Sequence, residues 1–359
     1  MLPRINQRPF ILSALTLCMS GAAFAATSPT HASTSDEDTV IVTANRTESS
    51  LWDSPATIQV IDRQTLQNST SVSIADDLQD IPGVEVTDNA LAGRKQIRIR
   101  GEASSRVLIL IDGQVVSYQR AGQNYGAGLL IDESALERIE VVKGPSGAEA
   151  GRGGAGGYIN LVSKLPHSES SQEVSATYNT AEHARLTADI NQALSAGTAV
   201  RLNVMGQEGG VDGRDYVENN SYAVAPSIAF GLDSDTRFYL YSQHVRQRNI
   251  PDGGIPTIGM KGFYYNNTDA KLTQAQRDII NAAVNAAEPV NRENFYGNIN
   301  DHEDVDANLF TAKVESDLSK NVKLTNISRF GKTEMERALT GVNALVISNL
   351  AAPKDPNSW

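Results

Sequence analysis

Cysteine is almost absent from this chain, and long apolar runs are absent from all but its N-terminal end. The single cysteine among the 359 residues is Cys18. A chain without further cysteine has no disulfide framework, no thiol nucleophile in its later part and no cysteine-based metal site. Because no later stretch reaches about 18 consecutive apolar residues, we expect no membrane-spanning helix. The shorter strands of a membrane barrel stay possible, since their inward positions are polar.

Basic charge is also scarce, because 31 Lys and Arg face 42 Asp and Glu and leave a net charge of −11. This balance argues against the phosphate backbone of a nucleic acid as a partner. No histidine lies between residues 51 and 166, so the nucleophile–base pairs of a hydrolase are scarce there. Gly151, Gly153 and Gly156 match the spacing of a dinucleotide fingerprint, but a β-prone run follows where that fingerprint needs a helix. We therefore expect no enzyme, no catalytic residue and no cofactor.

The N-terminal 50 residues are predicted to be a signal and a linker. Residues 1–25 contain Arg4 and Arg8, then an apolar run, then an Ala-Phe-Ala cleavage pattern, which together indicate a secretory signal peptide. Residues 26–50 are rich in Ser and Thr and are expected to be disordered. Within them lies a short β-prone run able to add a strand to a partner's sheet edge: Asp38, Thr39, Val40, Ile41, Val42, Thr43 and Ala44.

Residues 51–165 are predicted to be one α+β domain. Its β-rich runs end in Gly or Pro, and its short helical runs carry apolar residues at helical spacing. The dipeptide Asp112-Gly113 after one apolar run indicates a tight hairpin turn. The expected strands cover 52–62, where the strand follows a turn at Pro55, and 97–101, 106–112, 136–142 and 158–164, and the expected helices cover 64–67, 73–79 and 131–136.

Residues 166–359 show a different pattern, in which strands of about ten residues alternate apolar and polar side chains. Leu186, Ala188 and Ile190, for example, share one face of their strand. Short turns alternate with one long connection over 247–304. This pattern is typical of an outer-membrane barrel, whereas a soluble β-sandwich explains the alternation but not the signal peptide. The expected strands cover 185–193, 199–207, 222–230, 237–246, 307–317 and 321–330.

The order of these motifs resembles the N-terminal part of the TonB-dependent outer-membrane receptors. Residues 77–84 resemble the helix and Ile-Pro-Gly-Val turn of that family's plug domain, 136–141 resemble its Ile-Glu-Val strand, and 38–44 resemble its TonB box. The resemblance implies an α+β plug domain followed by an antiparallel transmembrane β-barrel of about 22 strands. This chain would hold about seven or eight of them, and an open sheet cannot span a bilayer, so we expect a fragment or truncated product.

The resemblance also implies a function. The Gly-rich run around Arg152 and the loop at 249–259 resemble a subgroup that takes up ferric catecholate siderophores. It implies active uptake of a ferric siderophore across the outer membrane of a Gram-negative bacterium, with a TonB-type periplasmic energy transducer binding residues 38–44. We expect a monomer in outer-membrane lipid. The alternatives are a receptor for haem or another iron complex, and a surface-binding remnant that transports nothing.

Arginines and aromatic rings suit a planar, anionic ferric catecholate, because guanidinium groups neutralise charge and rings stack on catechol faces. The resemblance places them in one inner and one outer loop. The candidates for binding substrate are Tyr118, Arg120, Gln123, Tyr125, Arg152, Arg246, Arg248, Tyr264 and Tyr265. Receptors for haem tend to present a histidine from each loop, whereas here the inner segment has none and His302 stands alone.

Four acidic residues near the end of the long connection form a candidate metal site. Asp301, Glu303, Asp304 and Asp306 offer the oxygen ligands that a hard cation prefers. No glycine lies among them to turn the chain around an ion. We therefore expect a solvated loop and no resident metal.

Overall fold

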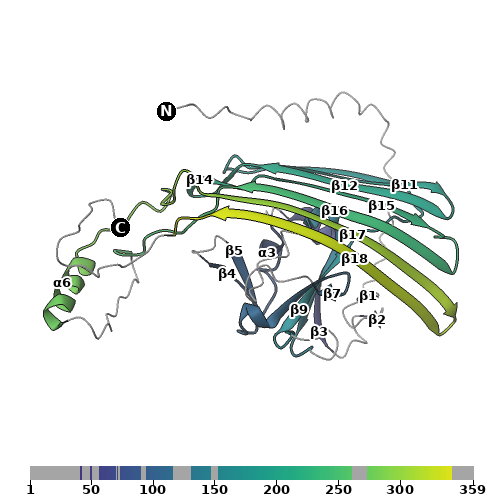
Figure 1. Cartoon of the computed structure of the whole chain (residues 1–359), viewed down its shortest axis with the longest axis horizontal. Helices are drawn as coiled ribbons and strands as arrows, with labels where there is room; N and C mark the ends of the chain where they lie inside the picture. Colours follow the sequence, from purple (N-terminus) through teal and green to yellow (C-terminus); the bar gives the residue numbers. More distant parts are fainter. Residues whose placement is uncertain are drawn as a thin grey trace, which may run out of the picture.

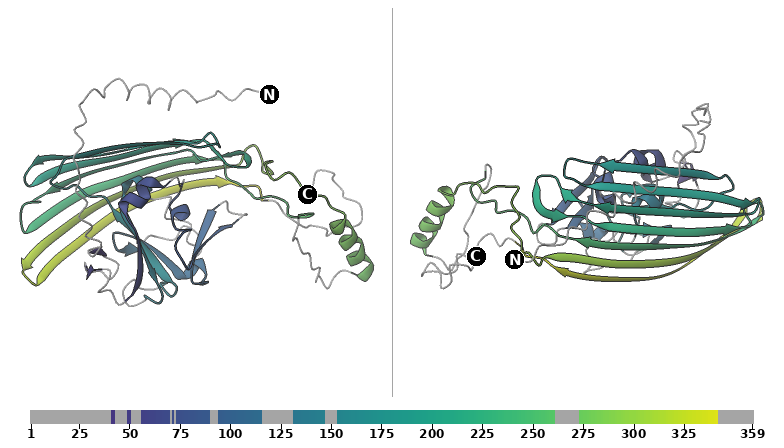
Figure 2. Two further views of the ribbon diagram at one scale, coloured as in Figure 1. Left: turned by 180° about the vertical axis from the view of Figure 1, so that it is seen from behind. Right: turned by 90° about the horizontal axis from the view of Figure 1, so that it is seen from above.

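The computed structural model of the chain describes residues 41–42, 49–50, 56–69, 71, 73–89, 94–115, 131–146, 153–260 and 273–341. Within these residues, two bodies lie against each other. A small mixed domain, here called the inner domain (residues 56–163), lies on the concave side of a large curved antiparallel sheet, here called the wall (Figures 1 and 2). The predicted signal peptide at 1–25 and most of the linker at 26–50 fall outside the described residues.

The inner domain is built on a five-stranded sheet of order β3-β8-β9-β6-β7, in which β6 and β9 are parallel. Short helices and a separate hairpin of β4 and β5 complete it. Every residue of β6 is buried, as its unbroken apolar run predicts. The bounds are β3 Thr57–Ile61, α2 Arg63–Asn68, α3 Ile74–Asp77, β4 Val84–Asn89, β5 Arg94–Ile99, η2 Ser104–Arg106, β6 Val107–Ile111, β7 Gln114–Val115, η3 Glu133–Ala135, β8 Leu136–Lys143 and β9 Gly157–Ser163.

The turn after β6 has the backbone that its sequence predicts. Asp112 has φ +50° and Gly113 has φ +77°, which are the positive angles of a type I′ turn. Asp tolerates this region better than most residues because its short side chain bonds locally. The turn therefore holds a carboxylate at the end of a buried strand.

The wall is a seven-stranded sheet of order β10-β11-β12-β15-β16-β17-β18. A β13–β14 hairpin and helix α6 lie in its connections, and α6 stands beyond one end of the wall, away from the inner domain (Figure 1). The bounds are β10 Ser171–Tyr178, β11 Ala184–Ser195, β12 Thr198–Glu208, β13 Gly210–Val211, β14 Arg214–Glu218, β15 Ser221–Phe230, β16 Thr236–Asn249, α6 Gln274–Asn285, β17 His302–Ser319 and β18 Val322–Ala338. No helix among the described residues is long and apolar enough to cross a membrane.

Two expectations about the long connection need correction. It contains helix α6, and β17 begins at His302 rather than near 307. Glu303, Asp304 and Asp306 are therefore strand residues and not a solvated loop. Their backbone groups are paired across β16 and β18, which removes the freedom that a loop would have.

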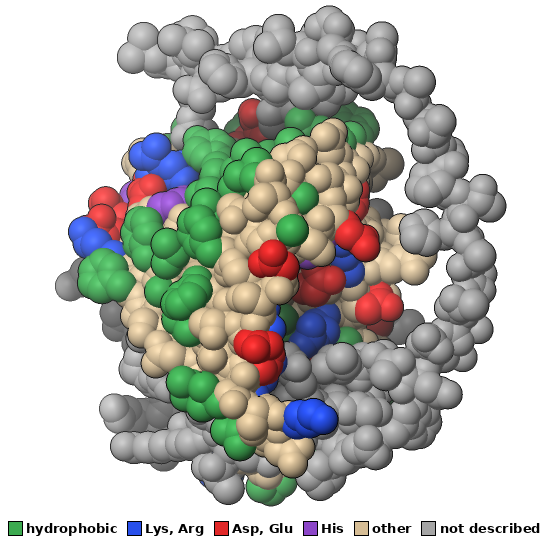
Figure 3. Space-filling model, turned by 90° about the vertical axis from the view of Figure 1, so that its right-hand side faces the viewer, with side chains coloured by type: hydrophobic (Ala, Val, Ile, Leu, Met, Phe, Trp, Pro, Cys, Tyr) green, Lys and Arg blue, Asp and Glu red, His purple; other side chains and the backbone are tan. Residues whose placement is uncertain are grey.

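The faces of the wall are the reverse of those of a water-soluble sheet. Large apolar side chains point outward and are exposed, including Leu240 at 52%, Phe310 at 50% and Phe330 at 72%. Polar and charged side chains such as Arg201 at 3% and Asn203 at 2% point inward and are buried. Figure 3 shows hydrophobic side chains gathered along one flank of the molecule. An apolar outer face and a polar inner face are the pattern of a sheet that borders lipid.

The inner face of the wall also carries an apolar patch that joins the core of the inner domain. Met205, Ala223, Val245 and Ala307 of the wall belong to the same buried cluster as Ile99 of the inner domain. Burying apolar surface contributes about 25 cal/mol per Å². The two bodies therefore pack against each other through a shared core, and the polar contacts described next surround that core.

Candidate functional site

Several charged side chains are buried in the contact surface between the inner domain and the wall, among them Glu133, Lys164, Asp189 and Arg201. One contact, here called the Asp112 anchor, joins the turn after β6 to β16 and β18. Oδ2 of Asp112 accepts hydrogen bonds from Arg329 Nη2 at 2.7 Å and from Tyr241 OH at 3.0 Å. Its Oδ1 accepts from the backbone N–H of Ser163 at 2.8 Å, and Arg329 Nη1 donates to the carbonyl of Ile111 at 2.7 Å. The carboxylate and the guanidinium thus neutralise each other, and each also makes hydrogen bonds to the groups around it.

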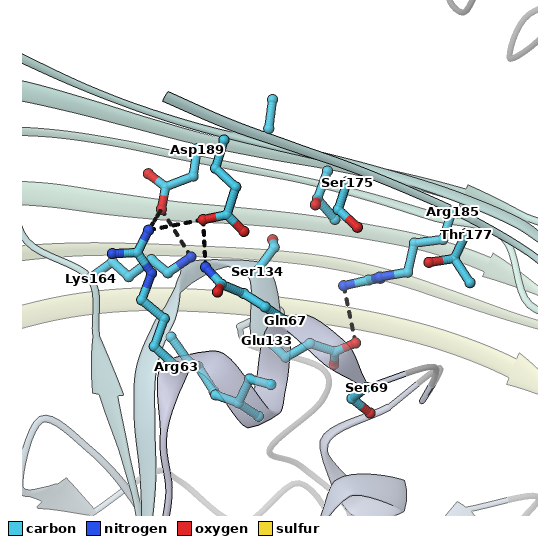
Figure 4. Close-up of a pocket in the computed structure, with 15 residues that line it drawn as sticks. Arg63, Gln67, Ser69, Glu133, Ser134, Lys164, Ser175, Thr177, Arg185 and Asp189 are labelled. Carbon is cyan, nitrogen blue, oxygen red and sulfur yellow. Dashed lines mark hydrogen bonds and ion pairs between the residues drawn. The ribbon is translucent and has the colours of Figure 1, made fainter. Parts of the chain in front are cut away.

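A second contact, here called the α2 seam, joins helix α2 to β10 and β11. Arg63 Nη2 lies 3.0 Å from Glu173 Oε2 and 3.5 Å from Asp189 Oδ2, and Gln67 Nε2 donates to Glu173 Oε2 at 2.5 Å. Helix α2 presents these residues because Asp62 caps its N-terminus, accepting from the N–H of Thr65 at 2.7 Å. All of the α2 seam contacts run between side chains (Figure 4).

Asp189 has further partners that do not belong to α2. Arg201 Nε and Nη2 approach its two oxygens at 2.8 and 2.7 Å, and Lys164 Nζ lies at 2.9 Å. The bidentate geometry makes Arg201 the strongest of these partners. The carboxylate of Asp189 is therefore neutralised by the wall and by the residue that follows the inner domain, whether or not Arg63 is near.

A third contact places several acids around one guanidinium. Arg185 of β11 lies 2.8 Å from Asp132 Oδ1 and 3.0 Å from Glu133 Oε1, and it also donates to Gln207 at 2.8 Å. Burial, followed by the charge of Asp132, raises the pKa of Glu133 well above its ordinary value. Burial likewise raises the pKa of Asp77, whose charge also acts on Arg185. Three carboxyl groups therefore compete for one buried cation.

A cavity lies between the α2 seam and the contacts of Arg185, bounded by α2, η3 and strands β10 and β11 (Figure 4). Its charged lining residues come from different elements and are of both signs: Arg63, Lys164, Arg185, Glu133, Glu173 and Asp189. Hydroxyl groups line much of the remaining surface, from Ser69, Ser134, Ser175, Thr177 and Thr187. This arrangement can hold water or a polar ligand.

Comparison with known proteins agrees with this architecture. Residues 50–158 match the model of the TonB-dependent receptor plug domain. The catecholate siderophore receptor Fiu of Escherichia coli K12 is 36% identical over 315 residues, which cover 86% of this chain and 38% of Fiu. The chain belongs to the TonB-dependent receptor family. Its location is accordingly the outer membrane of a Gram-negative bacterium, and its inner domain is the plug of that family.

Two further similarities describe the extent of the match. Protein YoeA of Escherichia coli K12 is 65% identical over 102 residues, covering 28% of this chain and 78% of YoeA. The crystal structure of the open form of the ferric-catecholate import receptor Fiu from E. coli K12 aligns with a TM-score of 0.70 at 35% identity, covering 81% of this chain and 40% of that one. The chain thus spans about two fifths of the length of Fiu.

For a TonB-dependent receptor, the predicted TonB box is of first interest. The structure describes the backbone of two of its residues, Ile41 and Val42, which form β1 and pair with β2 Ser49–Ser50. The other residues of the box, Asp38, Thr39, Val40, Thr43 and Ala44, lie outside the described residues. So do seven of the predicted substrate residues: Tyr118, Arg120, Gln123, Tyr125, Arg152, Tyr264 and Tyr265.

Arg246 and Arg248 are the two predicted substrate residues that the structure describes. They alternate with Val245, which is buried in the core shared with the inner domain, so they face outward on the side of Leu240. Arg246 Nε lies 3.0 Å from Asp306 Oδ1, and Arg248 Nη2 lies 2.6 Å from Asp306 Oδ2. The structure thus brings the two arginines together on the outer face, beyond the apolar band. Among the described residues, no cluster of acids or histidines could hold a metal ion.

Sequence reasoning missed the residues that join the inner domain to the wall. Asp112 was read only as a turn residue, and Arg185, Asp189 and Arg201 only as polar positions of alternating strands. A signal was present, because a charge at an inward strand position needs a buried partner. The partner itself could not be named from the sequence.

Proposed function

We propose that this chain serves the TonB-dependent uptake of a ferric siderophore of the catecholate type. The observation that carries the proposal is the inner domain held by ion pairs inside a wall whose outer face is apolar, in a chain 36% identical to a catecholate siderophore receptor. The ferric complex is the cargo and not a cofactor. No bond is made or broken, so the chain is not an enzyme.

The proposed cycle has three steps. The ferric complex binds to the outer loops and the apex of the inner domain, and this binding stabilises a state in which residues 38–44 are released below. A ligand can shift such an equilibrium only by its differential affinity for the two states. A TonB-type transducer then pairs with the released box as an added strand and pulls on it. The receptor works as a monomer surrounded by outer-membrane lipid.

Deletion of the box tests the proposal in the receptor that carries this chain. Removing residues 38–44 should leave binding of a ferric catecholate intact and abolish uptake of radioactive iron, because only the transducer contact is lost. Deletion of residues 29–35 is the matched control, since it shortens the same linker by the same length and should preserve uptake. Full uptake after deletion of 38–44 would contradict the proposal.

The cargo class can be tested separately by growth under iron limitation. A strain that depends on this receptor should grow on ferric dihydroxybenzoate, a simple catecholate, and should not grow on haem as the only iron source. Growth on haem alone would replace the catecholate assignment by the haem alternative. Binding of both without growth on either would favour the surface-binding alternative.

A further inference from the structure

The inner domain is attached to the wall unequally at its two sides. At the Asp112 anchor, the side chains of Asp112 and Arg329 are 11% and 12% exposed. At the α2 seam, the side chains of Arg63 and Glu173 are 31% and 37% exposed. Water therefore reaches the second pair far more readily than the first.

Opening the α2 seam leaves little charge uncompensated. When Arg63 withdraws, Asp189 keeps its bidentate partner Arg201 and also Lys164. Glu173 and Arg63 are exposed enough to be solvated where they stand, and ion pairs between such groups contribute little to stability. The seam can thus open and close without leaving a buried charge unpaired.

Opening the Asp112 anchor has the opposite consequence. Separating Asp112 from Arg329 would leave a carboxylate and a guanidinium both uncompensated and nearly buried, which is strongly unfavourable. The same movement would break the hydrogen bonds from Tyr241 and Ser163 to Asp112 and from Arg329 to a backbone carbonyl. Gln114, two residues further on, adds a bond from its Nε2 to the carbonyl of Ile327 at 2.8 Å.

The lining of the cavity at the α2 seam suits a polar, oxygen-rich cargo. Three cationic side chains, from Arg63, Lys164 and Arg185, reach it together with the carboxyl groups of Glu133, Glu173 and Asp189, and the serine and threonine hydroxyls around them can exchange hydrogen bonds with a passing ligand (Figure 4). Because α2 touches the wall here through side chains, movement of α2 would widen the cavity without breaking a sheet.

We propose that the route for the ferric complex opens at the α2 seam, between α2 and strands β10 and β11, while the Asp112 anchor stays closed and acts as the fixed side. The inference rests on the proposed transport function. It assigns Arg63 and Gln67 to the moving side and Glu173 to the static side. The cargo passes along the hydroxyl-lined face of β10 and β11.

Two pairs of introduced cysteines test this in the receptor that carries the chain. Gln67→Cys with Glu173→Cys spans the α2 seam, and Gln114→Cys with Ile327→Cys spans the anchored side. The native Cys18 lies in the predicted signal peptide, so the introduced pair supplies the only thiols within residues 26–359, and any cysteine in the rest of the receptor is replaced by serine. Each pair is joined in whole cells with a short reagent that reacts with two thiols, and uptake and binding of radioactive ferric dihydroxybenzoate are measured.

The cross-link at 67 and 173 should lower uptake at least tenfold with binding retained, and the cross-link at 114 and 327 should leave uptake within about twofold of the unreacted receptor. Normal uptake with 67 and 173 joined would overturn the inference, and so would equal loss with either pair joined. Both double variants must transport before cross-linking. If neither they nor the native receptor takes up ferric dihydroxybenzoate, the proposed function fails, and the inference fails with it.

Discussion

The carboxylate of Asp112 and the guanidinium of Arg329 lie 2.7 Å apart, although 217 residues separate them in the chain. Asp112 sits at a turn with positive φ, at the end of a fully buried strand, and Arg329 points inward from β18. The contact therefore ties a buried strand of the inner domain to a strand at the edge of the described wall. It also explains why a turn residue is an aspartate.

Asp112→Asn should destabilise the protein by about 3 kcal/mol, because it leaves the buried Arg329 without a counter-charge. Asparagine also tolerates positive φ, so the turn itself should survive. Denaturant unfolding of the purified protein in detergent measures the change. Glu102→Gln is the control, because it breaks an exposed ion pair with Arg106 and should cost less than about 1 kcal/mol. Equal effects of the two substitutions would contradict a special role for the buried pair.

Stability should fall as pH rises through the range in which Glu133 loses its proton. Burial raises the pKa of Glu133 above its ordinary value, so the folded protein holds this proton more tightly than the unfolded chain. The resulting stabilisation is fully present below the ordinary pKa and is lost as pH rises through the raised one. For one group the slope cannot exceed about 1.4 kcal/mol per pH unit. Asp77 acts in the same direction.

Glu133→Gln should flatten this dependence in part, leaving the smaller contribution of Asp77. Thermal unfolding midpoints measured between acidic and mildly alkaline pH would show it. Glu85→Gln replaces an exposed carboxyl of the same domain and should leave the slope unchanged. If Glu133→Gln left the slope unchanged, the carboxyl of Glu133 would not bind its proton more tightly in the folded protein than in the unfolded chain.

Arginine introduced on the outer face should be tolerated only beyond the apolar band. Phe310→Arg places a charge among exposed apolar side chains and should cost about 2–4 kcal/mol in a bilayer. Asn308→Arg lies two residues away on the same face of β17, beside His244, and should cost about 1 kcal/mol or less. Folding of the receptor that carries this chain into lipid vesicles under a urea gradient compares the two variants. Similar costs would argue that the exposed face of the wall does not border lipid.

Much of the fold could be predicted from local patterns in the sequence. The buried strand β6, the Asp112-Gly113 turn and the alternation in β11 and β12 were all predicted, because each is decided by residues close in sequence. The start of β17 was missed, since Glu303 and Asp304 are both polar and erase the alternation. Helix α6 was missed although Thr273 and Gln276 form a capping box, which is a readable signal.

The candidate site, too, could be predicted from the sequence only in part. Charges at inward positions of strands could be seen in the sequence, and so could the outward set of apolar residues. The pairing of these charges could not be predicted from the sequence. The partners of Asp112, Arg185 and Asp189 lie on elements that come together only when the inner domain packs on the wall. Arg246 was expected at the end of a strand and Arg248 in the loop after it, whereas the strand continues through both and turns them outward.

By itself, the sequence determined the kind of each domain, the period of the strands and hence the two faces of the wall, since these depend on spacing along the chain. Only the tertiary structure decided the pairings across the junction and their unequal burial. The reason is physical: the free energy of a charge pair depends on distance and on access to water, and neither is set until distant segments meet.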